Sequence, residues 1–159
     1  MILYHGSYMV VEKPDLSFSR LRTDFGKGFY LTPMKAQAER WADRFLRERG
    51  TGVVSCYEFA PDIAGKFKTL EFDAHTVEWL NFITSCRLGR PVDTEWDLVI
   101  GGVANDKVFD TLQLYFDKLL GVTESIARLQ YHKPNVQYCF KSQSVIDAHL
   151  RFIDSEALK

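Results

Sequence analysis

The chain has 159 residues, 46% of them hydrophobic and 14% aromatic, which predicts one domain, residues 1–159, with a single buried core. Its 20 Lys and Arg against 21 Asp and Glu give a formal net charge of −1, which argues against a protein that coats nucleic acid. This balance still permits a local basic face.

Apolar patterning predicts a mixture of strands and helices. Short runs rich in β-branched and aromatic residues predict strands, whereas apolar residues recurring at three and four positions predict helices. In chain order the expected elements are strand 2–4, strand 28–31, helix 33–49, strand 53–59, strand 67–72, helix 74–86, strand 98–100, helix 106–120, a short helix after Thr123, strand 136–141 and helix 143–150. Since no internal repeat or linker-like stretch interrupts this order, it indicates one α+β unit.

Residues that begin or end helices support several of these boundaries. Thr32 and Pro33 provide a cap and a first-turn proline, and Gly50 closes the same helix. Asn105 can cap the helix that follows it, and Pro134 precedes the last predicted strand. These signals locate the polar segments that connect the elements.

The cysteines and the first residues indicate the compartment. Cys56, Cys86 and Cys139 lie far apart and form no CxxC or Cys/His spacing, so they predict neither a disulfide framework nor a metal site. The start of the chain lacks a basic segment followed by a long apolar one, and no apolar run of about 18 residues occurs. We expect a cytoplasmic protein without a membrane segment or a bound metal.

The segment from Val10 to Thr23 has no clear period and carries Arg20 and Arg22. A loop of this kind can serve as a lid over a site. Its arginines, together with Lys27, can meet a pyrophosphate, although charges on loops are commonly just solvated.

Polar groups follow the first predicted strand, where the sequence reads His5-Gly6-Ser7. A histidine at the end of a strand is more often a satisfied structural group than a ligand contact. Here, however, an imidazole that can bond a ribose hydroxyl stands beside a bare backbone that can pair with a planar carboxamide and beside a further hydroxyl. The triplet is therefore a candidate binding segment.

A second candidate is the segment Gly26-Lys27-Gly28-Phe29-Tyr30. It can be read as a glycine turn before a strand with two core aromatics, and the dinucleotide fingerprint GxGxxG is absent. Paired with His5, however, Tyr30 becomes a candidate face for stacking on an electron-poor nicotinamide ring, and Gly28 lets a flat ligand approach the backbone.

These motifs together resemble the His and Tyr motifs of the ADP-ribosyltransferase superfamily, on the branch shared by diphtheria-type toxins and poly(ADP-ribose) polymerases. They are most similar to a bacterial family of single-domain proteins grouped in that superfamily. The resemblance spans nearly the whole chain and is specific only in combination. The segments that carry it are Tyr4-His5-Gly6-Ser7, Asp24 to Thr32, Gln37-Ala38 with Trp41-Ala42, Val103 to Asp106, and Gln137 to Phe140.

The resemblance implies an α+β fold with a split β-sheet core of the ADP-ribosyltransferase type, helices at its flanks and NAD in the cleft as co-substrate. It implies that His5 bonds the adenine-side ribose and that the backbone of Gly6, supported by Ser7, holds the nicotinamide carboxamide. It further implies that Tyr30 stacks on the nicotinamide ring.

Gln137 departs from the superfamily pattern. The resemblance implies a glutamate at this place on a late strand, where it bonds the nicotinamide ribose and stabilises the cation formed as nicotinamide leaves. A glutamine carbonyl can accept the same hydrogen bond, but it carries no full negative charge and is a poor proton acceptor. The substitution predicts weaker catalysis, or catalysis supplied by another group.

Asn105 and Asp106 form a third candidate segment. A cap at a strand-to-helix junction needs no further function. The functional alternative places Asp106, or the free amides at the start of the helix, near a phosphate or the acceptor.

From these residues and this resemblance we expect an NAD-dependent ADP-ribosyltransferase in which His5, Tyr30 and Gln137 act on the glycosidic bond. The expected acceptor is a protein or a nucleic acid, which the loops do not identify. Alternatives are an NAD glycohydrolase, a non-catalytic nucleotide-binding module and a purely structural interaction domain. Bacterial members of the superfamily often act as toxins or defence effectors paired with a neutralising antitoxin protein, a role that this chain fits by analogy only.

Overall fold

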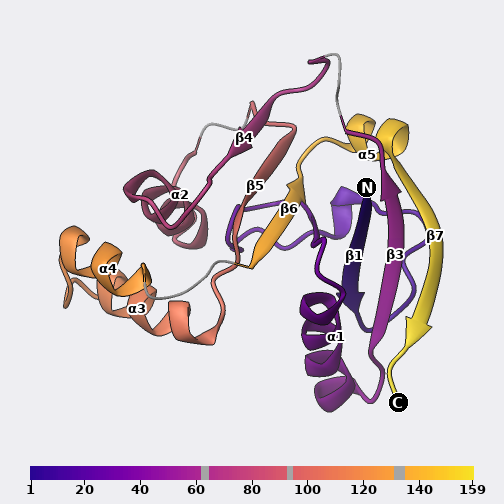
Figure 1. Cartoon of the computed structure of the whole chain (residues 1–159), viewed down its shortest axis with the longest axis horizontal. Coiled ribbons are helices and arrows are strands. Elements are labelled where there is room, and N and C mark those ends of the chain that lie inside the picture. Colours follow the sequence, from indigo (N-terminus) through magenta and orange to yellow (C-terminus); the bar gives the residue numbers. More distant parts are fainter. Residues whose placement is uncertain (62–64, 93–94, 131–134) are drawn as a thin grey trace.

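A computed structural model describes residues 1–61, 65–92, 95–130 and 135–159 (Figure 1). Within these residues the chain forms two sheets and five α-helices. In chain order the elements are β1 (Ile2–Ser7), a short 3₁₀ helix (Leu16–Phe18), β2 (Phe29–Leu31), α1 (Lys35–Arg49), β3 (Val53–Phe59), β4 (Thr69–Glu71), α2 (Val77–Arg87), β5 (Leu98–Gly102), α3 (Asp106–Phe116), α4 (Val122–Leu129), β6 (Val136–Phe140), α5 (Gln143–His149) and β7 (Leu150–Ala157).

The strands divide into a three-stranded and a four-stranded sheet that lie side by side (Figure 1). The first has the order β1-β3-β7 and is antiparallel throughout. The second has the order β2-β6-β5-β4, in which only the β4–β5 pair is parallel. One isolated bridge between Tyr4 of β1 and Thr32 after β2 joins the two sheets in the described part of the chain.

Apolar residues from both sheets form a shared core, which explains why the sheets stay together despite this single bridge. Leu3 and Tyr57 from the first sheet pack with Phe29 and Phe140 from the second, and all four are buried. Because burial of large apolar side chains is the main favourable term in folding, this cluster fixes the angle between the sheets.

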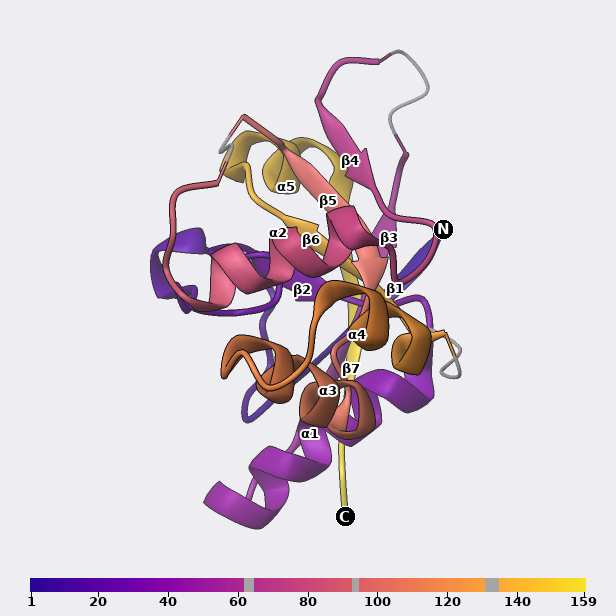
Figure 2. The ribbon, with the colours of Figure 1, turned by 90° about the vertical axis from the view of Figure 1, so that its left-hand side faces the viewer.

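A second core lies beneath the helices that follow β4. Trp79 of α2, Leu112 of α3 and Leu129 of α4 are fully buried against Val99 of β5 and Cys139 of β6. Figure 2 shows these three helices covering one face of the four-stranded sheet. That face of the four-stranded sheet is therefore covered by helices.

The mixed α+β class with flanking helices is confirmed, while several predicted boundaries are wrong. Strand β7 was not expected. The helix predicted to reach residue 150 ends at His149, and the chain continues directly into this strand. Helix α3 ends at Phe116 rather than near residue 120, and Gly121 precedes α4 instead of ending α3. Pro134, expected before the last strand, lies outside the described residues.

Candidate functional site

A cavity of about 820 Å³ opens where the two sheets diverge. This volume lies in the range of small-molecule and cofactor sites, which is about 300–1,000 Å³. Its wall combines the end of β1, the loop 8–24, the start of β2, one side of α1 and single residues of α2 and β6. Six of the eight residues expected to be catalytic or cofactor-binding line it: His5, Gly6, Ser7, Gly28, Tyr30 and Gln137.

The backbone of Gly6 faces this cavity edge because of the way β1 and β2 separate. Tyr4 and Thr32 exchange two backbone hydrogen bonds, at 2.8 and 2.9 Å. Since successive residues of a strand direct their peptide groups to opposite edges, the amide and carbonyl of Gly6 face the same edge as those of Tyr4. No β2 residue pairs with Gly6 in the described part of the chain. A planar carboxamide can therefore pair with Gly6 at this edge.

The absence of a side chain at Gly6 also has a structural cause. A Cβ atom there would lie 2.1 Å from the carbonyl oxygen of Ala38 and 2.8 Å from the amide nitrogen of Ala42, both in α1. Glycine thus lets α1 pack directly on β1, beside the cavity. Gly28 is restricted in the same way, since its Cβ would lie 2.9 Å from the carbonyl oxygen of Phe140.

His5 is held as a neutral hydrogen-bond acceptor. Its Nδ1 lies 2.7 Å from the carbonyl oxygen of Tyr30, and because a carbonyl can only accept, Nδ1 carries the proton. Burial lowers the pKa of the ring from 6.5 to about 4, although the bond to Tyr30 opposes this shift. Near neutral pH the second ring nitrogen, Nε2, is therefore unprotonated and can accept a bond from a ribose hydroxyl.

The buried neutral state of His5 predicts a dependence of stability on pH. Its folded pKa of about 4 lies below the unfolded value of 6.5, so the unfolded chain binds the extra proton in this window. The stabilisation is present above the window and is lost as the pH falls. Between about pH 7 and about pH 5, wild type is expected to lose on the order of 2 kcal/mol more than His5→Asn, measured by urea denaturation. Equal losses in the two proteins would contradict the buried neutral ring.

Tyr30 contributes its ring to the cavity and its hydroxyl to the neighbouring turn. The hydroxyl lies 2.8 Å from the Thr23 hydroxyl, donates to the Gly26 carbonyl at 2.7 Å and accepts from the Phe25 amide at 2.9 Å. Burial raises the pKa of the phenol well above 10, so it stays protonated. The ring stacks on Phe25 with centroids 6.5 Å apart. Tyr30 is thus a rigid wall rather than a mobile side chain.

Tyr30→Phe separates these two contributions. The variant keeps the ring but leaves the buried amide of Phe25 without its acceptor, so it is expected to lower the free energy of unfolding by about 1–3 kcal/mol. Urea denaturation measures this loss. Tyr115→Phe is the matched control, because that hydroxyl is exposed and makes a single bond of 3.4 Å to Asn81. A control that loses as much as Tyr30→Phe would show that the turn does not depend on the Tyr30 hydroxyl.

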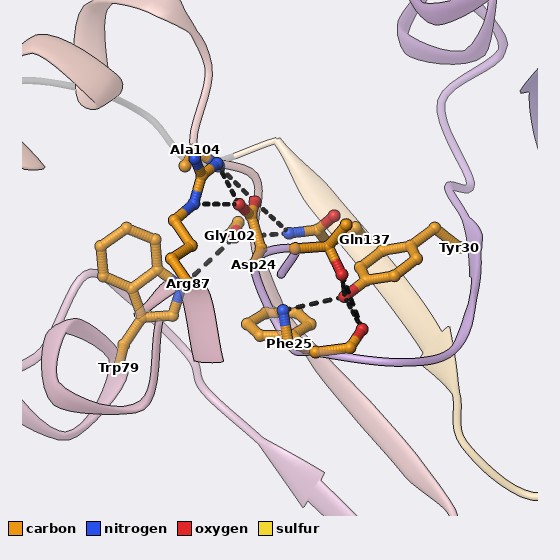
Figure 3. Close-up of polar contacts among 10 residues, drawn as sticks. Asp24, Phe25, Tyr30, Trp79, Arg87, Gly102, Ala104 and Gln137 are labelled. Carbon is orange, nitrogen blue, oxygen red and sulfur yellow. Dashed lines mark hydrogen bonds and ion pairs between the residues drawn. The ribbon is translucent and has the colours of Figure 1, made fainter. Parts of the chain in front are cut away.

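Gln137 of β6 also lines the cavity and is 3% exposed; Figure 3 shows it between Asp24 and Tyr30. Its Nε2 donates to Asp24 Oδ2 at 2.8 Å and to the Gly102 carbonyl at 3.2 Å. Both partners are pure acceptors, which fixes which end of the amide is nitrogen. The carbonyl oxygen, Oε1, is left as an acceptor for a ligand.

Among the charged residues that line the cavity without having been expected as site residues, two are paired with each other. Asp24 precedes the Phe-Gly-Lys-Gly turn, and Arg87 ends α2. Arg87 donates through Nε to Asp24 Oδ1 at 2.9 Å and forms a second bond to it through Nη2 (Figure 3). A lone Asp or Arg gives no signal in the sequence, because these partners are 63 positions apart.

Asn105 and Asp106 are not among the residues that line the cavity. Asn105 forms the predicted cap of α3, where its Oδ1 accepts from the Val108 amide at 3.0 Å. The two residues before Asn105, Val103 and Ala104, do line the cavity.

The predicted loop covers part of the cavity and is fastened near its start. The loop residue Val11 donates its amide to Ser55 at 3.3 Å and its carbonyl accepts from Tyr57. Arg20 and Arg22 are exposed and line the cavity, whereas Lys27 does not line it. The two arginines are therefore placed to meet an anionic part of a ligand.

The residues that the structure describes contain neither a metal-binding cluster nor a membrane-spanning helix. No group of three or more His, Cys, Asp or Glu side chains among them could hold a metal ion. None of the helices in those residues is long and apolar enough to cross a membrane.

Comparison with known proteins identifies a family. Residues 1–152 match the model of a family described as "Protein of unknown function (DUF3990)". Neither a curated protein nor a solved structure matches the chain significantly. The functional argument therefore rests on the residues and geometry of the cavity.

Proposed function

We propose that this chain, which belongs to the DUF3990 family, is an ADP-ribosyltransferase that moves ADP-ribose from NAD to a macromolecular acceptor. The observation that supports it best is the content of one cavity: the neutral imidazole of His5, the unpaired edge of Gly6, the ring of Tyr30 and the carbonyl oxygen of Gln137. Each of these groups matches one part of a dinucleotide that carries a nicotinamide.

Binding would use the end of β1 and the ring of Tyr30. The carboxamide of nicotinamide would pair with the amide and carbonyl of Gly6, while its ring lies against Tyr30. His5 Nε2 would accept from a hydroxyl of the adenine-side ribose. Arg20 and Arg22 would face the pyrophosphate. Holding both ends fixes the glycosidic bond between them.

In the reaction, the bond between the ribose carbon and the ring nitrogen of nicotinamide breaks. The electron pair stays on the ring nitrogen, so nicotinamide leaves as a neutral molecule. The ribose becomes cationic, and Gln137 Oε1 would accept a hydrogen bond from a ribose hydroxyl and stabilise that charge. A nucleophile of the acceptor then forms the new bond to the same carbon and releases its proton to solvent. With water in place of the acceptor, the same steps give hydrolysis of NAD.

The proposal is tested by incubating the protein with NAD labelled in its adenine, with and without a cell lysate. Nicotinamide release together with label bound to protein or nucleic acid supports transfer. Release without bound label supports a glycohydrolase. If nicotinamide is released in neither case, the catalytic proposal is wrong.

The neutral side chain of Gln137 favours a second candidate, a non-catalytic module that binds NAD. Such a module would be stabilised against thermal unfolding by NAD and would release no nicotinamide. Thermal shift and nicotinamide assays on the same sample separate the two candidates.

A cellular role as a toxin or defence effector with a neutralising protein partner follows from the proposed activity by analogy. It predicts that expression in bacteria arrests growth and that His5→Ala relieves the arrest. A folded His5→Ala protein that still arrests growth would contradict this role, and plating of induced cultures provides the measurement.

A further inference from the structure

Asp24 places a full negative charge in the cavity wall, next to the neutral Gln137. Its side chain is only 9% exposed, and both of its oxygens are used (Figure 3). Oδ1 accepts from Arg87, and Oδ2 accepts from the Ala104 amide at 3.0 Å and from Gln137 Nε2 at 2.8 Å.

Every partner of this carboxylate is a hydrogen-bond donor, which matches the acceptor-only chemistry of a carboxylate group. A buried charge is costly unless it is paired and hydrogen-bonded, and Arg87 and the Ala104 amide meet that condition. Because its oxygens are occupied, Asp24 is poorly placed to take a proton from a substrate. Its connection to the proposed ribose contact runs through the amide of Gln137.

We infer that Asp24 is a positioning residue, which orients and polarises the Gln137 amide so that Oε1 faces the ribose with increased negative charge. This inference rests on the proposed function, because the ribose of NAD is the group that Oε1 would contact. Asp24 fixes the amide nitrogen on its own side and thereby turns the oxygen away from itself. Hydrogen bonds in such a chain polarise one another, and the effect is larger in a buried site.

The same geometry explains why a glutamate would not fit at position 137. A carboxylate there would face Asp24 Oδ2 and the Gly102 carbonyl, both of which are acceptors. Two carboxylates in direct contact repel each other and cannot both ionise freely. Asp24 therefore favours a glutamine at position 137. The negative charge that a glutamate would supply at position 137 is supplied by Asp24 instead, one side chain further from the ligand.

Four proteins test this inference: wild type, Asp24→Asn, Gln137→Glu and the double variant Asp24→Asn/Gln137→Glu. The double variant exchanges amide and carboxylate, so it keeps the net charge and allows a donor–acceptor pair between the two positions. The carboxylate at position 137 still faces the Gly102 carbonyl, and the amide nitrogen at position 24 faces the Ala104 amide, so the expected recovery is partial. Nicotinamide release from NAD gives kcat and KM, and melting temperatures report folding. Asp117→Asn is the matched control, since Asp117 also accepts from a glutamine amide, Gln113 at 3.1 Å, but on the surface.

Asp24→Asn and Gln137→Glu are each expected to lower kcat about 10- to 100-fold, with a smaller change in KM, because the charge is needed most when the ribose becomes cationic. The double variant is expected to recover kcat at least about tenfold over Gln137→Glu. A merely structural role for Asp24 would lower the melting temperature of Asp24→Asn without lowering the kcat of its folded protein. The control should keep the wild-type kcat.

Three outcomes would overturn the inference while leaving the proposed function in place: a wild-type kcat in folded Asp24→Asn, a Gln137→Glu enzyme at least as active as wild type, or no recovery in a folded double variant. Wild-type protein that releases no nicotinamide rejects the proposed function and the ribose contact together. If a single variant fails to fold, the hydrogen bond between Gln137 and Asp24 is tested in wild type instead. The measurement is the side-chain amide signal of Gln137 in the nuclear magnetic resonance spectrum. Fast exchange of its protons with water would reject the bond to Asp24.

Discussion

His5→Ala is expected to lower kcat/KM for nicotinamide release by about 100-fold, because it removes two contacts at once. The first is the Nε2 acceptor for the ribose hydroxyl, and the second is the 2.7 Å bond from Nδ1 to the Tyr30 carbonyl, which joins the two sides of the cavity. Loss of the second contact lets Tyr30 shift relative to Gly6, so the nicotinamide is no longer held at both its ring and its carboxamide. Steady-state assays over a range of NAD concentrations provide the measurement.

His149→Ala is the control for this variant, because that ring lies at the end of α5 against Phe67 and does not line the cavity. It should keep the wild-type kcat/KM. Circular dichroism and melting temperatures show whether both proteins are folded. A folded His5→Ala protein with wild-type kcat/KM would remove His5 from the site.

Gly6→Ala is expected to cost about 3 kcal/mol or more of unfolding free energy, because the added methyl group meets backbone rather than a flexible side chain. Its Cβ would lie 2.1 Å from the Ala38 carbonyl oxygen and 2.8 Å from the Ala42 amide nitrogen, so α1 has to move away from β1. Urea denaturation measures the loss, and a chain that fails to fold agrees with it.

Gly121→Ala is the matched control for the Gly6 variant. A Cβ at Gly121 meets nothing within 4 Å, and its φ of −77° suits any residue. The change in stability should stay within about 1 kcal/mol, because Gly121 is the N-cap of α4 and alanine is a poorer cap than glycine. If Gly6→Ala were as stable as this control, the close packing of α1 on β1 would be wrong, and so would the position of α1 beside the cavity.

Local sequence signals were sufficient for most of the fold. Helix α1 ends as expected at Gly50, whose φ of +77° is a left-handed conformation that glycine adopts easily. Strand β3 has its predicted bounds because its buried β-branched and aromatic residues form one continuous run. Thr32, expected to cap α1, instead donates its hydroxyl to the Val136 carbonyl at 2.8 Å, and the helix starts after Met34. A distant strand thus altered what the local pattern favoured.

Strand β7 could not be predicted because it has almost no apolar pattern of its own. Most of its residues are exposed, and it is held by backbone pairing with β3, about a hundred positions earlier in the chain, from Val53 with Ala157 to Phe59 with Leu150. Pairing of this kind is invisible to periodicity, which reports only which side chains are buried.

Some residues of the candidate site could also be predicted from the sequence, whereas the contacts between distant residues could not. His5 and Tyr30 could be singled out because each stands beside glycines at a strand end, and the cavity contains both. The contact between Gln137 and Asp24 joins residues 113 positions apart and depends on how β6 packs against the turn before β2. This contact needed the structure, whereas the cap that Asn105 forms was predicted from the sequence.

The most direct test of the central claim is a crystal structure with a non-hydrolysable NAD analogue. The account predicts a single analogue in this cavity, with its carboxamide paired to Gly6, its nicotinamide ring against Tyr30 and a hydroxyl of the adenine-side ribose at His5 Nε2. It also predicts Gln137 Oε1 within hydrogen-bond distance of the other ribose. An analogue bound elsewhere on the protein, or a cavity that stays without it at saturating concentration, would contradict the account.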